Sequence, residues 1–162
     1  MLTRDYVAGL MDYQRDTGTF IWRVTQGSVK AGRRAGSRHS SGYVHVRINK
    51  RGYKAHQLVW LMETGTWPAF PLDHIDGDGG NNHHSNLRDC TMSQNKANSR
   101  SYKNNKSGIK GVCYNKKLNR WGASIQCGGK RHHLGLFHTK EEAAEVYMAS
   151  AALFFGPFAR AA

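Results

Sequence analysis

The residues with the clearest chemical potential are Asp73 and His74, which stand side by side before a loop rich in glycine, aspartate and asparagine. A carboxylate can hold a divalent cation, and a neutral imidazole can take a proton from water. These are the two parts needed to hydrolyse a phosphodiester. Asp76 and Asp78 fit turn positions better than ligand positions. A zinc cluster is a weaker alternative, because a glycine-rich loop sets no defined ligand spacing. Its histidines would be His74, His83 and His84.

Three elements must position this pair. Residues 72–75 form a short apolar stretch typical of a strand, and residues 76–82 favour turns and left-handed conformations. A capping box then predicts that a helix begins at Thr91 and carries Asn95. Strand, polar loop and helix can aim Asp73 and Asn95 at one point from two elements.

Upstream of this segment, the chain is predicted to combine short strands with two helices. Strands are expected at 19–23, 43–48 and 53–55, and helices at 3–13 and 56–63. His56, at the start of the second helix, is interpreted as a structural core residue, with a catalytic role as the weaker alternative. The glycine-rich basic loop at 26–42 leaves two interpretations open, a phosphate contact or a solvated surface.

The charge balance limits the class of partner. The chain of 162 residues has 24 Lys and Arg against 11 Asp and Glu, a formal charge of +13, which indicates a polyanion such as nucleic acid. Residues 1–95 carry a net +4, and residues 96–162 carry a net +9. No long apolar run or signal peptide is evident, so no membrane partner is expected, and no obligate protein partner is inferred. Three separated cysteines indicate neither a disulfide framework nor a zinc ribbon and favour an intracellular location.

Four segments together resemble the HNH endonucleases common in bacteriophages, some of them homing endonucleases, which are built on the ββα-metal motif. They are residues 56–60, residues 73–77, Asn82 and residues 86–88. The resemblance implies that His74 is the general base and that Asp73 is a metal ligand. It also implies that Asn82 holds the loop and orients the His74 backbone, and that Asn95 replaces the family's last histidine as second ligand. An oxygen ligand set favours Mg²⁺, with Mn²⁺ as a substitute.

The last third of the chain follows a different pattern. Residues 96–107 carry almost no apolar side chain and are predicted to be a basic linker, which could lie along a DNA groove or simply be solvated. Its candidate DNA contacts include Arg100 and Lys103. Strands are then expected at 108–114, 119–126 and 130–137, followed by a helix at 139–155. The apolar stripe of that helix is predicted to be Ala143, Tyr147, Ala151 and Phe154.

This segment resembles the APETALA2-type DNA-binding domain of plant ethylene-response factors. The matching motifs are 108–112, 120–121, 134–137 and 141–152. The resemblance implies that a three-stranded sheet enters the major groove. The residues at matching contact positions are Lys110, Arg120, Trp121 and Arg131. Gln126 and His133 replace the usual Arg and Trp, so the plant target sequence does not transfer. Lys116 and Lys117 are expected to contact phosphates, and a core position is an equal alternative for Trp121.

These observations predict an α+β protein of two modules. An HNH nuclease module at 1–95, with its ββα-metal core at about 53–98, is followed by the linker at 96–107 and by a DNA-binding module at 108–158. The expected activity is metal-dependent hydrolysis of duplex DNA in the cytoplasm of a bacterial host, with nicking by a monomer. The alternatives are a DNA-binding regulator with a decayed nuclease site and a zinc-stabilised structural protein.

Overall fold

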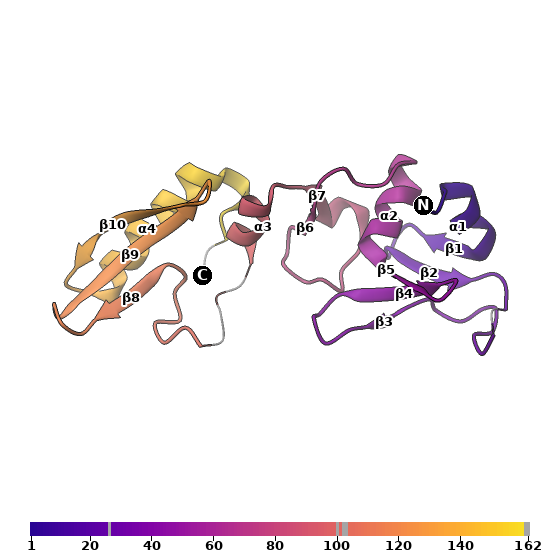
Figure 1. Ribbon diagram of the computed structural model, residues 1–162, viewed down its shortest axis with the longest axis horizontal. Helices are drawn as coiled ribbons and strands as arrows, with labels where there is room; N and C mark the ends of the chain where they lie inside the picture. The colour runs from indigo at the N-terminus through magenta and orange to yellow at the C-terminus, as the bar shows by residue number, and fades with distance from the viewer. Residues whose placement is uncertain (26, 100, 102–103, 161–162) are drawn as a thin grey trace. The chain divides into compact units, whose positions relative to one another are not determined.

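The computed structural model describes residues 1–25, 27–99, 101 and 104–160. The chain divides into two compact units, Met1–Asp89 and Cys90–Ala162, each with a hydrophobic core (Figure 1). No helix in the described part of the chain combines the length and the apolar character needed to cross a membrane. The predicted α+β class is confirmed.

The first unit contains three small antiparallel sheets and two helices. Its elements are α1 (Arg4–Leu10), β1 (Met11–Gln14), β2 (Thr19–Trp22), β3 (Ser37–Arg38), β4 (Val44–Ile48), β5 (Arg51–Lys54), α2 (Ala55–Thr64), β6 (Leu72–His74), η1 (His84–Asn86) and β7 (Leu87–Asp89). β1 pairs with β2, β4 lies between β3 and β5, and β6 pairs with β7. These pairings place the long loop at 75–86 between two hydrogen-bonded strands.

The helix predicted at 3–13 ends at Leu10, because the next residues form β1. Met11 pairs with Trp22 in the β1–β2 register, and both side chains are buried in the core. Pairing with a distant strand therefore overrides the local helical pattern. The α2 helix agrees with its prediction and closes at Gly65, whose φ of 78° is the left-handed conformation common after helices.

The second unit is a three-stranded antiparallel sheet packed on one long helix. Its elements are α3 (Met92–Asn98), β8 (Val112–Asn115), β9 (Arg120–Cys127), β10 (Lys130–Phe137), α4 (Lys140–Phe155) and η2 (Gly156–Phe158), and the strand order is β10-β9-β8. β8 starts four residues later than predicted. Gly111 lies just before it with φ of 72°, and a Cβ there would come 2.1 Å from the Tyr147 ring. Close packing against Tyr147 of α4 thus requires glycine at position 111, and β8 begins only after this residue.

Alanines on one face of α4 allow the helix to approach the sheet. Ala143, Tyr147, Ala151 and Phe155 are buried at a spacing of four residues. Phe154 was predicted in this stripe but is 44% exposed, because it lies one residue, about 100°, around the helix. The predicted capping box is present at Thr139, which starts the helix.

Candidate active site and nucleic-acid interface

The β6–β7 hairpin positions the first two candidate residues. Asp73 lies opposite Arg88 in the antiparallel register, and His74 lies opposite Leu87. Asp73 and His74 are almost fully buried, with 5% and 4% of their surface exposed. A buried carboxylate needs a partner, and Arg88 Nε and Nη2 donate to Asp73 Oδ2 at 2.9 and 2.8 Å. This ion pair fixes the carboxylate beside the imidazole.

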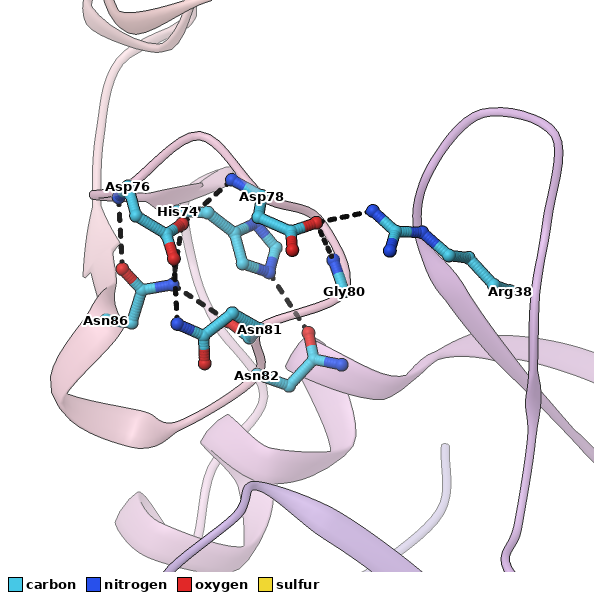
Figure 2. A network of polar contacts seen from close by, with 8 residues as sticks. All are labelled: Arg38, His74, Asp76, Asp78, Gly80, Asn81, Asn82 and Asn86. Atoms are coloured by element: carbon cyan, nitrogen blue, oxygen red, sulfur yellow. Dashed lines mark hydrogen bonds and ion pairs between the residues drawn. The ribbon is translucent and has the colours of Figure 1, made fainter.

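The His74 imidazole is held through its ring. His74 Nε2 lies 3.0 Å from Asn82 Oδ1 (Figure 2). Because an amide oxygen can only accept a hydrogen bond, this contact requires a proton on Nε2. The sequence led us to expect that Asn82 would orient the His74 backbone. In the structure Asn82 contacts the His74 ring, and its role in orienting the His74 backbone stays a prediction.

The loop after His74 is braced by Asp76 and Asn86 (Figure 2). Asn86 Oδ1 accepts the Asp76 N–H at 3.1 Å, and Asn86 Nδ2 donates to Asp76 Oδ1 at 3.0 Å. Asp76 also accepts from the Asp78 N–H at 2.8 Å and from Asn81 Nδ2 at 2.7 Å. Burial alone would raise the pKa of Asp76, but these hydrogen bonds hold it below its usual range. Asp76 thus shapes the turn, and Asn86 ties the loop closed.

Two aromatic side chains pack around the His74 ring. His56, in the first turn of α2, meets it edge-on at 5.0 Å between centroids, and Tyr43 lies 5.7 Å away. Burial lowers the pKa of His56 to about 3, and the charges of His74, Lys54 and His45 act in the same direction. No described residue makes a hydrogen bond with His56 Nδ1. His56 is therefore a neutral packing residue of this cluster.

The two predicted metal ligands belong to different units, Asp73 to the first and Asn95 on α3 to the second. A carboxylate and an amide oxygen are the ligand types that Mg²⁺ binds, so the donor chemistry fits that ion. Their convergence on a single cation stays a prediction. Among the described residues, no three His, Cys, Asp or Glu side chains gather as metal ligands. The alternative cluster of His74, His83 and His84 is therefore not formed.

The α3 helix is fixed at both ends within the second unit. Its predicted capping box is present at Thr91. At the other end, the Lys110 ammonium donates to backbone oxygens of Lys96, of Ala97 at 2.8 Å and of Ser99 at 3.0 Å. Burial lowers the pKa of Lys110 to about 8, and the charges of Arg160 and Lys96 act the same way. Lys110 thus caps the helix, and its contact with DNA stays a prediction.

Four predicted DNA-contacting residues share one face of the second sheet. Arg131 lies opposite Gln126, and His133 lies opposite Ser124. Arg120 is on the same face of β9, because it is an even number of residues from Gln126. Arg131 is braced there by hydrogen bonds from Nε and Nη2 to Ser124 Oγ at 3.1 and 2.9 Å. The structure therefore gathers these side chains on a surface suited to a polyanion.

The remaining candidates lie elsewhere. Lys116 and Lys117 are exposed in the turn between β8 and β9. Trp121 is partly buried against the core of the unit, with its ring 5.1 Å from that of Tyr114. Trp121 therefore packs at the edge of the core, as one of its two interpretations expected. A contact between Trp121 and DNA stays a prediction. Arg100 and Lys103 lie outside the described residues.

Comparison with known proteins agrees with this geometry. The family model described as HNH endonuclease matches residues 53–97, from β5 to α3. Protein 3.8 of Escherichia phage T7 is 34% identical over 115 residues, which cover 68% of this chain and 94% of the phage protein. The chain belongs to the HNH endonuclease family. A second relative, described as an uncharacterized HNH endonuclease of Acanthamoeba polyphaga mimivirus, is 38% identical over 121 residues. That alignment covers 74% of this chain and 62% of the mimivirus protein.

The sequence did not reveal two features of this HNH site. The brace role of Asn86 depends on which backbone groups the closed loop brings near it, and only the Asn-Leu-Arg series marked the position. The ion pair between Asp73 and Arg88 depends on the β6–β7 register. The alternation of Leu87 with two polar neighbours was the available clue to β7, which was not predicted.

Proposed function

We propose that the chain is a metal-dependent endonuclease that hydrolyses phosphodiester bonds in duplex DNA and cuts one strand per active site. The observation that carries the proposal is the buried Asp73–His74 pair, whose imidazole is oriented by Asn82 inside the segment that matches the HNH family. A single site on each chain acts on one strand, so a monomer nicks, and a double-strand break takes two events.

In the proposed reaction, His74 is the general base. With Nε2–H held by Asn82, the imidazole of His74 takes a proton from a water molecule. The water oxygen forms a bond to phosphorus, the bond to the 3′ oxygen breaks, and that oxygen gains a proton from solvent. The products are a 5′ phosphate and a 3′ hydroxyl. Asp73 and Asn95 would hold the divalent cation, most simply Mg²⁺ with Mn²⁺ as a substitute, which when bound stabilises charge on the phosphate oxygens.

The second unit is proposed to position the nuclease on DNA. Its resemblance to APETALA2-type domains and the shared sheet face of Arg120, Gln126, Arg131 and His133 support binding in the major groove. Lys116 and Lys117, in the adjoining turn, are placed to contact the backbone. No protein partner enters the proposal. The match to a phage protein supports action in the cytoplasm of a bacterial host.

One assay tests the nuclease proposal. Supercoiled plasmid is incubated with the full chain in Mg²⁺, in EDTA, and in Mg²⁺ with the variant His74→Ala. We expect nicked circles only in the first reaction, because the other two lack the cation or the base. His138→Ala, an exposed histidine of the second unit, is the matched control and should nick like the wild type. Binding of the plasmid without cutting in every reaction would instead identify a DNA-binding regulator with a decayed site.

A further inference from the structure

The first unit contains a long segment without a single acidic residue. Between Asp16 and Glu63 there are nine Lys or Arg residues and no Asp or Glu. The net charge of the unit hides this segregation, because its acidic residues lie before and after the segment. A one-signed segment of this size creates a local positive potential that attracts polyanions.

Part of this segment is an ordered backbone rather than a loose loop. Residues 32–35 run beside β2, where the Trp22 N–H donates to Arg33 O at 2.9 Å and the Ala35 N–H donates to Phe20 O at 2.7 Å. Ile21 and Arg34 form a bridge in the same antiparallel ladder. The backbone hydrogen bonds therefore hold Arg33 and Arg34 one after the other along the edge of β2, and their side chains are exposed.

Two hollows lie along this edge, and Arg34 lines both. The first, of about 420 Å³, is also lined by Lys30 and Arg33. The second, of about 490 Å³, is also lined by Arg38. Within the described part of the chain, Lys30, Arg33 and Arg34 form no ion pair. Their guanidinium and ammonium groups are thus available to an anionic ligand.

The second hollow ends on the loop that orients His74. Asp78, Gly80 and Asn81 form its far wall, and the next residue is Asn82, the partner of the imidazole. Figure 2 shows Arg38 reaching this loop, with Nη2 2.5 Å from Asp78 Oδ1. The same oxygen accepts the Gly80 N–H at 2.9 Å. The charge of Asp78 is therefore balanced, and the guanidinium of Arg38 is held beside the loop.

Gly80 leaves room for this approach. A Cβ at Gly80 would lie 3.2 Å from the guanidinium carbon of Arg38 and 3.3 Å from Asp78 Oδ1. A side chain there would crowd the ion pair. The glycine thus permits the hairpin that carries Arg38 to rest against the loop that carries Asn82.

We propose that Lys30, Arg33, Arg34 and Arg38 form a phosphate track for the backbone of duplex DNA, which leads along β2 to the His74 loop. The inference deepens the proposed nuclease function by naming where the first unit holds the strand to be cut. Arg34 and Arg38 contact phosphates near the scissile bond, and Lys30 and Arg33 contact phosphates further along. Arginine suits this role, because its planar fork donates two hydrogen bonds to one phosphate.

The test is the salt dependence of DNA binding, measured with the full chain in EDTA so that no cutting is required. The variant is Arg34→Gln with Arg38→Gln. The matched control is Arg47→Gln with Arg51→Gln, which removes two exposed cations of the same acid-free segment outside both hollows. Each lost phosphate contact reduces the slope of log K against log salt by about 0.9. We expect the slope to fall by about 2 and affinity to fall roughly 10- to 100-fold for the track variant, with little change for the control.

A second pair, Lys30→Gln with Arg33→Gln, keeps the test valid if the loss of Arg38 disturbs the loop, because Lys30 and Arg33 line only the hollow that the loop does not border. This pair should also lower the slope by about 2. An unchanged slope in both track pairs, or an equal loss in the control, would overturn the track. If the wild type does not nick but the track pairs weaken binding, the nuclease proposal fails and the track stands. If the wild type nicks DNA and both track pairs bind with an unchanged salt slope, the track fails and the nuclease proposal stands.

Discussion

Buried polar side chains distinguish the two units. Among the described residues, the buried polar ones of the first unit are His56, Asp73, His74 and Asn82, three of which can ionise, whereas those of the second unit are Asn98 and Ser107. Burying ionisable groups costs stability unless each has a partner. In the first unit Arg88 on β7 pairs with Asp73 and Asn82 in the irregular loop contacts the His74 ring, whereas Arg131 of the second unit lies exposed on a regular sheet. The proposed chemistry and the proposed DNA contact thus place opposite demands on the fold.

The loop at 75–86 and the sheet of the second unit also differ in the hydrogen bonds that stabilise them. The loop at 75–86 depends on side chains that bond to backbone groups, chiefly those of Asp76 and Asn86. The sheet of the second unit depends on backbone ladders, with strands of up to eight residues. Loss of one side chain should therefore disturb the loop at 75–86, whereas a similar loss should leave the sheet of the second unit intact.

Asn86→Ala should have the largest effect. It removes hydrogen bonds to the Asp76 N–H, to Asp76 Oδ1 and to Asn81 O, so the loop that holds Asn82 should shift. We expect nicking to fall at least ~100-fold, as for a displacement of about 1 Å in an active site. The free energy of unfolding should fall by about 2 to 3 kcal/mol in urea titrations. Asn115→Ala, which removes two turn contacts in the second unit, should leave nicking unchanged, and equal losses would break the comparison.

His56 should make the stability of the first unit fall in acid. The native pKa is lowered to about 3, whereas an unfolded histidine titrates near 6.5. The unfolded state therefore binds more protons between these values, and unfolding free energy decreases by about 1.4 kcal/mol per pH unit as pH falls through that window. His56→Leu should reduce this dependence in chemical denaturation at pH 6 and pH 4.5. His39→Leu, at an exposed position, should not, and identical slopes for both variants would contradict the prediction.

Lys110→Met should have a smaller effect, confined to the second unit. It removes the ammonium that caps the carboxyl end of α3, and hydrogen bonds from charged groups contribute about 1 to 3 kcal/mol. We expect a loss of about 1 to 2 kcal/mol in urea titrations, because the group is half-buried. Lys130→Met, on an exposed strand end, is the control. Unchanged stability in Lys110→Met would show that α3 is held by its apolar contacts alone.

The smallest effect on stability is expected from Arg120→Gln, on the shared face of β9. Arg120 is partly exposed, and surface substitutions away from special contacts change the free energy of unfolding by less than about 0.5 kcal/mol. Its salt slope in DNA binding should nevertheless fall by about 1 if it contacts a phosphate. Thermal unfolding and titration of a labelled duplex measure the two quantities. A large loss of stability in Arg120→Gln with normal DNA binding would contradict the prediction, because Arg120 would then support the fold rather than bind DNA.

Local patterns predicted the elements whose residues decide their own conformation. β4 and β9 follow from alternation, and α3 and α4 follow from their capping boxes. The adjacent Asp73 and His74 indicated the chemistry. β1 could not be predicted, because only its pairing with β2 makes it a strand. The ring contact of Asn82 and the brace role of Asn86 also depend on loop closure, which no local pattern encodes.

The hydrogen bonds from Lys110 to the carboxyl end of α3 limit where domains of this protein can be exchanged. α3 has seven residues, too few to persist as an isolated helix, and its carboxyl end is secured by a lysine thirteen residues downstream of Ala97. A graft that joins the first unit and α3 to a foreign domain directly after residue 97 would leave Asn95 on an unsupported turn. Exchange of modules should succeed only at junctions that carry residues 90–112 along as one piece.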